Sequence, residues 1–213
     1  MNKTSGILLR LLCPFILLAC QNKKESPSSI DKEEKDSNAI VKPEVSSNPY
    51  AAVDISPMDM SYYPVDYPKL KMTNSISTAP VMRLIYSRPH LQGRKLFHNL
   101  LKYGEPWRLG ANEATEIQFY RDVSIQNKKI KAGRYILYCI PQEKTWTIVL
   151  NSNVDTWGLK IDSTKDLQRF EVPITHDNPS LEYLTIIFEK TNQGAKLLMA
   201  WEDIVAELPI DFN

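Results

Sequence analysis

Residues 115–151 read TEIQFYRDVSIQNKKIKAGRYILYCIPQEKTWTIVLN, and this stretch decides the fold. Its first six residues alternate between polar and apolar side chains, which is the period of a strand with one buried face. Two longer apolar runs follow at 134–140 and 145–151, separated by the turn-forming sequence PQEK. A shorter pair of runs, 123–125 and 129–130, flanks the residues QNK, which are typical of a hairpin turn. The stretch therefore predicts consecutive antiparallel strands.

Similar β-rich runs lie on both sides of this stretch. They occupy residues 81–86, 167–174, 183–188, 196–201 and 205–210. Short strands at intervals of roughly 10 to 20 residues are typical of an antiparallel sandwich or barrel. The one helical segment that we expect lies within residues 93–103, where Leu96, Leu100 and Tyr103 share a face. The predicted fold class is all-β: an antiparallel β-sandwich or barrel-like domain with one short helix, spanning residues 58–213.

The chain before residue 58 has a different character. Residues 20–57 are rich in Ser, Asn, Lys, Glu, Asp and Pro and show no apolar period, so we expect a disordered N-terminal tether. Residues 1–19 place Lys3 and Arg10 before or at the start of a nine-residue apolar run. That run is long enough for an export signal but about half of the ~18 apolar residues that span a bilayer. We therefore predict a cleavable signal peptide over residues 1–19.

The signal ends in Leu-Leu-Ala-Cys at residues 17–20, which resembles the lipobox of bacterial lipoproteins. In such proteins the cysteine becomes the N-terminal residue and its thiol receives diacylglycerol. Each methylene group of the acyl chains that is buried in the bilayer adds ~0.8 kcal/mol of membrane affinity. Gln21 follows at the position where an Asp commonly retains a lipoprotein in the inner membrane. The sequence therefore predicts that Cys20 is lipidated and that the protein is lipid-anchored in the cell envelope, at the outer membrane. An ordinary cleavable signal with an accidental cysteine is the alternative.

Charge and cysteine content exclude two further classes of protein. The chain has 26 basic and 25 acidic residues, so it lacks the basic surface of a nucleic-acid-binding protein. Cys13 lies in the signal and Cys20 is consumed by the lipid, so Cys139 has no partner for an intrachain disulfide. We expect Cys139 to be buried in a strand as a small apolar side chain, with a catalytic thiol as the alternative.

The sequence predicts neither a metal site nor a cofactor. Its three histidines, His90, His98 and His176, do not show the spacing of metal ligands. No G-x-S-x-G motif is present for a nucleophilic serine.

Residues 86–115 hold the densest polar and aromatic motifs of the chain. They are YSRP at 86–89, Gly93-Arg94, Phe97, Tyr103-Gly104, Trp107-Arg108 and GANEAT at 110–115, followed later by AGRY at 132–135, Ile140-Pro141, Trp146 and Trp157-Gly158. In these motifs, and over about residues 67–211, the chain resembles the domain-of-unknown-function family 2911. The resemblance implies an envelope protein with a β-rich fold and implies no established activity. The chain departs from the family pattern at His98-Asn99, where small glycines are usual, and at residues 159–161.

Seven side chains of these motifs are candidates for ligand binding. They are Arg88, Arg94, Trp107, Arg108, Asn112, Glu113 and Trp157. Aromatic faces beside forked polar groups suit sugars or small anions, because the ring stacks while the fork fixes the orientation. The alternative is a purely structural network, in which Arg–Glu pairs and an Asn join loops at one end of the domain.

Three functional hypotheses follow. The first is a tethered envelope domain that binds a small polar ligand, a glycan or a protein partner without covalent chemistry. The second is an envelope hydrolase that uses His90 with Glu113, which requires the two side chains within hydrogen-bond reach in a deep pocket. The third is a structural component of an outer-membrane complex, which predicts a contiguous exposed apolar patch.

Overall fold

The computed structural model of the protein describes residues 50–212. The predicted signal peptide, Cys20 and the tether up to residue 49 lie outside the described residues. The elements, in chain order, are β1 (Met58–Tyr63), α1 (Tyr67–Met72), β2 (Met82–Ser87), the short helix η1 (Leu96–Leu100), β3 (Glu116–Phe119), β4 (Val123–Ile125), β5 (Lys128–Ile130), β6 (Gly133–Pro141), β7 (Thr145–Asn151), the 3-10 helix η2 (Ser163–Lys165), β8 (Asp166–Thr175), β9 (Leu181–Lys190), β10 (Gly194–Glu202) and β11 (Ile204–Asp211).

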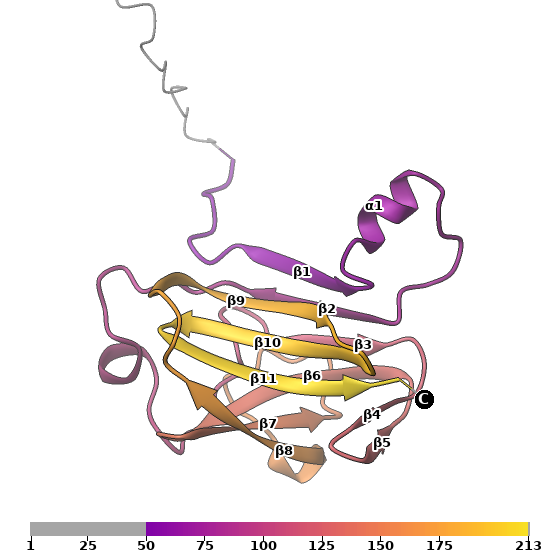
Figure 1. Ribbon diagram of the computed structural model, residues 1–213. Coiled ribbons are helices and arrows are strands. Elements are labelled where there is room, and N and C mark those ends of the chain that lie inside the picture. The colour runs from indigo at the N-terminus through magenta and orange to yellow at the C-terminus, as the bar shows by residue number, and fades with distance from the viewer. Residues whose placement is uncertain (1–49, 213) are drawn as a thin grey trace, which may run out of the picture. The chain divides into compact units, whose positions relative to one another are not determined.

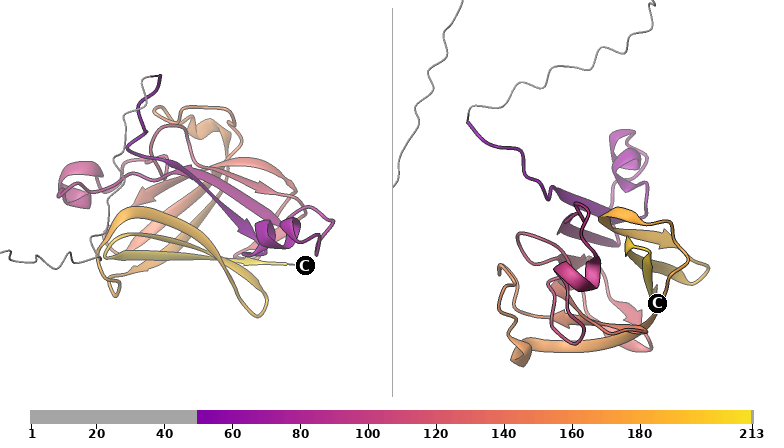
Figure 2. Two further views of the ribbon diagram at one scale, coloured as in Figure 1. Left: turned by 90° about the horizontal axis from the view of Figure 1, so that it is seen from above. Right: turned by 90° about the vertical axis from the view of Figure 1, so that its left-hand side faces the viewer.

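The strands form one antiparallel sheet. Its neighbours follow the order β1-β2-β3-β6-β7-β8-β11-β10-β9, and the β4–β5 hairpin pairs with β11. The sheet curls until its two end strands, β1 and β9, lie next to each other (Figure 1 and, from two other sides, Figure 2). The domain is therefore a nearly closed antiparallel barrel, which confirms the predicted all-β class and decides between its two architectures.

Main-chain hydrogen bonds close one end of this barrel. The segment that follows β2 runs beside the start of β9, where the Leu184 N–H donates to the Pro89 carbonyl at 3.0 Å. Two residues further along, the Leu91 N–H donates to the Glu182 carbonyl at the same distance. The YSRP motif thus lies where the two ends of the sheet meet.

Side chains close the remainder of the seam. The Tyr86 hydroxyl accepts a hydrogen bond from the Ile186 N–H at 2.9 Å, and the Ser61 hydroxyl accepts one from the Phe188 N–H at 3.1 Å. A strand edge in a barrel seam must find partners for its main-chain groups, because a buried unpaired N–H is costly. β1 and β2 supply these partners to β9 with side-chain oxygens.

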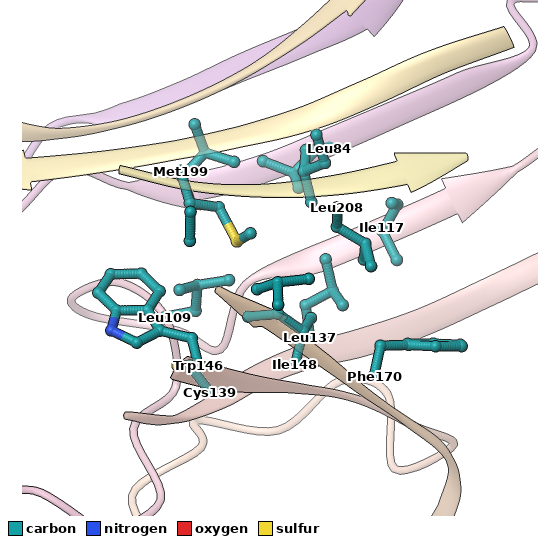
Figure 3. Packing of buried hydrophobic residues seen from close by; sticks show 14 of the residues in the cluster. Leu84, Leu109, Ile117, Leu137, Cys139, Trp146, Ile148, Phe170, Met199 and Leu208 are labelled. Carbon is teal, nitrogen blue, oxygen red and sulfur yellow. The ribbon is translucent and has the colours of Figure 1, made fainter. Parts of the chain in front are cut away.

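The interior is apolar because the strands direct their hydrophobic side chains into it. Leu84 of β2, Ile148 of β7 and Phe170 of β8 are fully buried there (Figure 3). Cys139 of β6 lies in the same cluster with no exposed surface, which confirms that it is a buried apolar side chain. Burial raises the pKa of its thiol well above the usual range, so the thiolate is disfavoured.

Two elements differ from the prediction. The helix expected within residues 93–103 is present as the single turn η1, but a second helix, α1, lies in a proline-rich segment with no apolar period. β1 was not predicted because its pattern is inverted: Met58 and Met60 are exposed, whereas Asp59 and Ser61 face the barrel seam. Within residues 50–212, no helix has the length and apolar character needed to cross a membrane.

Candidate functional site

The loop from Trp107 to Thr115 crosses one end of the barrel and carries the WR and GANEAT motifs. Trp107 exchanges two main-chain hydrogen bonds with Cys139, at 2.7 and 2.8 Å. Leu109 is fully buried and points into the core beside Trp146 (Figure 3). The Thr115 hydroxyl donates to the Leu109 carbonyl at 2.7 Å. These contacts hold both ends and the centre of the loop, so the side chains at 107 and 108 have defined positions.

A groove of about 450 Å³ lies against this loop, and we call it the Trp107 groove. Its lining combines apolar residues with three cations and one carboxylate: Pro89, Arg94, Leu100, Leu101, Lys102, Glu105, Pro106, Trp107, Arg108, Gly110, Ala111, Gly158, Leu159 and Trp201. The volume lies within the range of small-molecule sites, about 300–1,000 Å³.

Trp107 and Trp201 form the aromatic part of the groove. Their rings stack with centroids 5.7 Å apart and an angle of 26°, and Trp146 meets Trp107 edge-on at 6.0 Å. The Trp107 indole N–H donates to the Gly110 carbonyl at 3.2 Å. Trp146 and Trp201 are almost completely buried, whereas Trp107 is half-buried. The buried rings of Trp146 and Trp201 therefore hold the Trp107 ring in place at the groove.

Arg108 is the cation with the fewest partners at this site. Among residues 50–212 its guanidinium makes no ion pair, and its Nε is buried without a hydrogen-bond partner. Burial lowers the pKa of Arg108 from its ordinary value, since no described carboxylate compensates the desolvated charge. A partly buried charge without a partner costs stability, so an unpaired arginine is a candidate for ligand binding.

Gly158 determines how closely the 157–159 loop approaches Arg108. Its φ is +75°, and a Cβ there would lie 2.8 Å from the Ala114 Cβ and 3.1 Å from the Arg108 Cβ. Only glycine fits both the left-handed backbone and this close packing. The loop therefore covers the stem of Arg108 and places Leu159 in the groove lining.

Two further cations line the groove. The Arg94 Nε donates to the Leu91 carbonyl at 2.8 Å and its Nη2 to the His90 carbonyl at 3.0 Å, so Arg94 is held by main-chain oxygens without a described carboxylate partner. Lys102 pairs with Glu105 at 3.3 Å, which neutralises that pair. The net charge of the Trp107 groove lining is therefore positive and comes from Arg94 and Arg108.

Residues 68–210 match the family described as "Protein of unknown function (DUF2911)". The chain belongs to this family. No curated protein and no solved structure matches the chain.

The DUF2911 motifs explain much of the site's construction. Gly110 packs against the Ser87 main chain so closely that a Cβ at this position would lie 3.0 Å from the Ser87 carbonyl oxygen. Trp107-Arg108 and Trp157-Gly158 supply the groove and its covering loop. The YSRP, GANEAT and WG motifs, which are far apart in the sequence, therefore meet at one end of the DUF2911 barrel.

Three of the seven predicted site residues, Arg94, Trp107 and Arg108, line the Trp107 groove. Trp157 lies in the covering loop and is 54% exposed, but it is not part of the groove lining. The other three predicted residues lie elsewhere in the domain, each with its own surroundings.

Arg88 is bonded within the barrel seam. Its Nε donates to the Leu184 carbonyl at 3.0 Å and its Nη2 to the Thr185 hydroxyl at 3.0 Å, while Nη1 lies 3.3 Å from Asp59 Oδ2. All three nitrogens therefore have partners that close the sheet, which is the structural-network role that the sequence left open for the arginines.

Asn112 and Glu113 are placed differently from each other. The Asn112 amide donates to Asp54 Oδ2 at 2.6 Å and to the Ser56 carbonyl at 3.2 Å, so it binds the segment that enters β1. Glu113 is exposed and lines a separate hollow of about 260 Å³ with Arg83 and Arg134. The groove and the GANEAT acid are thus distinct features of the surface.

The structure does not bond His90 to Glu113. His90 Nδ1 lies 3.6 Å from Glu182 Oε1, and its ring stacks on Tyr183 at 5.1 Å. No described hydrogen bond joins His90 and Glu113, and no group of three or more His, Cys, Asp or Glu side chains within residues 50–212 could hold a metal ion. The hydrolase alternative stays a prediction without geometric support.

The sequence missed several groove residues. Trp201 was not among the predicted site residues; it is buried in the core and also belongs to the groove lining. Lys102 and Glu105 were not singled out, although their i, i+3 spacing is a signal for an ion pair. The contact of Trp107 with Trp201 joins residues that are 94 positions apart, and no local pattern could have shown it.

Proposed function

We propose that this DUF2911 domain is the binding module of a cell-envelope lipoprotein and that it holds a small anionic ligand, without covalent chemistry, in the Trp107 groove. The observation that carries the proposal is Arg108, a partly buried guanidinium with no described acidic partner and an unbonded Nε. A carboxylate or phosphate group would supply the missing charge and hydrogen-bond acceptors together.

The rest of the groove suits a ligand that also has an apolar ring face. Trp107, Leu101 and Leu159 provide apolar surface, while Arg94 adds a second positive charge on the lining. Ligands bound to such surfaces combine a stacked ring with one or two oriented polar groups. A carboxylated or phosphorylated sugar, free or as one unit of a glycan, has this chemistry.

Binding of two matched sugars tests the proposal. Isothermal titration of the protein with glucuronate and with glucose should show saturable binding of the acidic sugar and much weaker binding of the neutral one. A hydrogen bond to a charged group contributes about 1.5–3 kcal/mol, so Arg108→Gln should weaken glucuronate binding roughly tenfold to hundredfold. Arg169→Gln, which removes an arginine paired with Asp166 at 2.8 Å, is the control and should not change binding.

The same variant separates a ligand site from a structural network. Because Arg108 has no described partner and its charge is partly desolvated, Arg108→Gln should leave the free energy of unfolding unchanged or raise it. A variant that unfolds the domain would favour the structural network. A variant that keeps its stability and binds glucuronate as tightly as the wild type would contradict the proposed site.

The lipid anchor is supported by the sequence around Cys20, which is outside the described residues. An acylated Cys20 at the end of a cleaved signal accounts for the apolar run at 11–19 and for the polar segment that follows it. Expression of Cys20→Ser should give an unprocessed protein without incorporated fatty acid. Normal processing and membrane retention of this variant would contradict the lipoprotein assignment, and leave the ligand site to be tested by itself.

A further inference from the structure

A second feature of the surface lies on the outside of β1 and α1. There a hollow of about 780 Å³ is lined by Met58, Asp59, Met60, Tyr62, Tyr67, Pro68, Lys71 and Ile85, and we call this the β1–α1 surface. Its one carboxylate, Asp59, is paired with Arg88 at 3.3 Å. Met58 is 61% and Met60 54% exposed. On the adjacent helix Met72 is 85% exposed and Lys69 is also at the surface. The Trp107 groove shares none of these residues.

The inverted pattern of β1 is what produces this surface. In a strand on a barrel, apolar side chains normally face the interior and polar ones face water. In β1 Asp59 bonds Arg88 and Ser61 bonds the Phe188 N–H in the seam. Met58 and Met60, which alternate with these polar residues, therefore point outward. Exposed methionines adapt readily to an irregular apolar partner.

We infer that the β1–α1 surface is a membrane-contact surface, which rests against the interface of the bilayer that carries the protein. Three observations favour a bilayer as the occupant. The hollow is shallow and open, its apolar side chains are accompanied by Lys69 and Lys71, and neither lysine has a described carboxylate partner. Asp66 lies between β1 and α1 and offsets one of these charges, so apolar contact supplies most of the affinity.

The position of the surface in the chain supports the same occupant and rests on the lipid anchor proposed above. β1 is the first strand of the domain, and 37 residues separate Cys20 from Met58. The tether predicted from the sequence, treated as a flexible chain of that length, would have a root-mean-square span of roughly 33 Å, at about 5–6 Å times the square root of the residue number. An acylated protein would therefore keep this surface within a few nanometres of lipid, where weak contacts become effective. Figure 1 shows β1 and α1 together on the side where the described chain enters the barrel.

Co-flotation with vesicles tests the inference without the lipid anchor. The chain starting at Gln21 retains the complete barrel core, all of which lies between residues 67 and 210, and it has neither the signal nor Cys20. We expect it to float with vesicles of phosphatidylcholine and phosphatidylglycerol, and more weakly with phosphatidylcholine alone. Met58→Ser with Met60→Ser should reduce the partition coefficient about tenfold or more. Lys69→Glu with Lys71→Glu should reduce it only on the anionic vesicles, by about fivefold for each positive charge removed.

A matched variant controls for general changes in surface polarity. Leu167 of β8 is 49% exposed, and Lys144 and Lys160 are exposed without described side-chain partners. Leu167→Ser with Lys144→Glu and Lys160→Glu should leave the partition coefficient unchanged. Failure of the unmodified chain to float, or equal losses in both sets of variants, would overturn the inference. A second protein copy as the occupant would appear as a concentration-dependent dimer that Met60→Ser dissociates, and this would also overturn it. Neither outcome affects the test of Cys20.

Discussion

Replacement of Tyr86 by Phe removes a hydroxyl that makes two hydrogen bonds in the barrel seam. One of them is a long donation to Asp59 Oδ2, at 3.4 Å, and the other is the short bond from the Ile186 N–H. The Tyr86 side chain is 2% exposed, and its hydroxyl accepts the Ile186 N–H at 2.9 Å across 100 residues of sequence. Tyr86→Phe keeps the ring and its packing but leaves a buried N–H without an acceptor. Such a loss costs about 1–3 kcal/mol, out of a total stability of about 5–15 kcal/mol for a domain.

Urea denaturation followed by tryptophan fluorescence measures this loss at neutral pH. Tyr135→Phe is the matched control, because its hydroxyl donates to the Lys131 carbonyl at 2.9 Å at an exposed site only four residues away. The control should cost less than about 0.5 kcal/mol. Equal losses in the two variants would refute the reasoning that the Tyr86 hydroxyl closes the seam.

The wild type and Tyr86→Phe should also differ in how their stability depends on pH, in a direction that the pKa of Tyr86 defines. Burial raises the pKa of Tyr86 from 10 to about 12, and the Ile186 N–H opposes part of this increase. The folded state therefore favours the neutral phenol, so the contribution is complete below pH 10 and is lost as the pH rises to 12. Two pKa units correspond to about 2.7 kcal/mol. Between pH 9 and 12 the wild type should lose most of this amount of stability in excess of the loss in Tyr86→Phe, and equal losses in the two proteins would contradict the assignment.

Two further changes test other parts of the structure. Gly158→Ala should destabilise the domain by several kcal/mol, because the added Cβ meets Ala114 and Arg108. Gly93→Ala, with a φ of +73° but no neighbour within 4 Å of a Cβ, should cost only about 1 kcal/mol. Similar melting temperatures for the two variants would contradict the close packing at Arg108. Cys139 should not react with iodoacetamide at pH 8 in the folded protein and should react once urea unfolds it, as mass spectrometry of the alkylated chain can show.

The sequence predicted a strand correctly where its pattern of polar and apolar residues matched the face that is buried in the barrel. Residues 115–120 and 145–151 alternate or are continuously apolar, and both lie in the paired centre of the sheet as β3 and β7. β1 was not predicted, because its polar side chains face the seam and its apolar side chains face outward. A binary pattern predicts which face is buried only when polar residues are not required inside.

The candidate site could be predicted in part, because its residues form contiguous motifs but their partners do not. Trp107 and Arg108 are adjacent in the sequence and both line the groove. Arg88 has the same chemistry as Arg108, yet its partners in β9 lie 96 and 97 residues away and engage it fully. Which arginine is paired and which is free depends on the closure of the barrel. No local pattern in the chain reports that.

The signal of the Arg108 side chain in solution tests the ligand site most directly. In a ¹H–¹⁵N spectrum of arginine side chains, addition of glucuronate to saturation should shift the Arg108 Nε–H resonance and should leave those of Arg88 and Arg169, which are already bonded in the domain, in place. An Arg108 resonance that stays in place while the protein binds glucuronate, or the absence of any binding, would contradict the assignment of the Trp107 groove as an anion site.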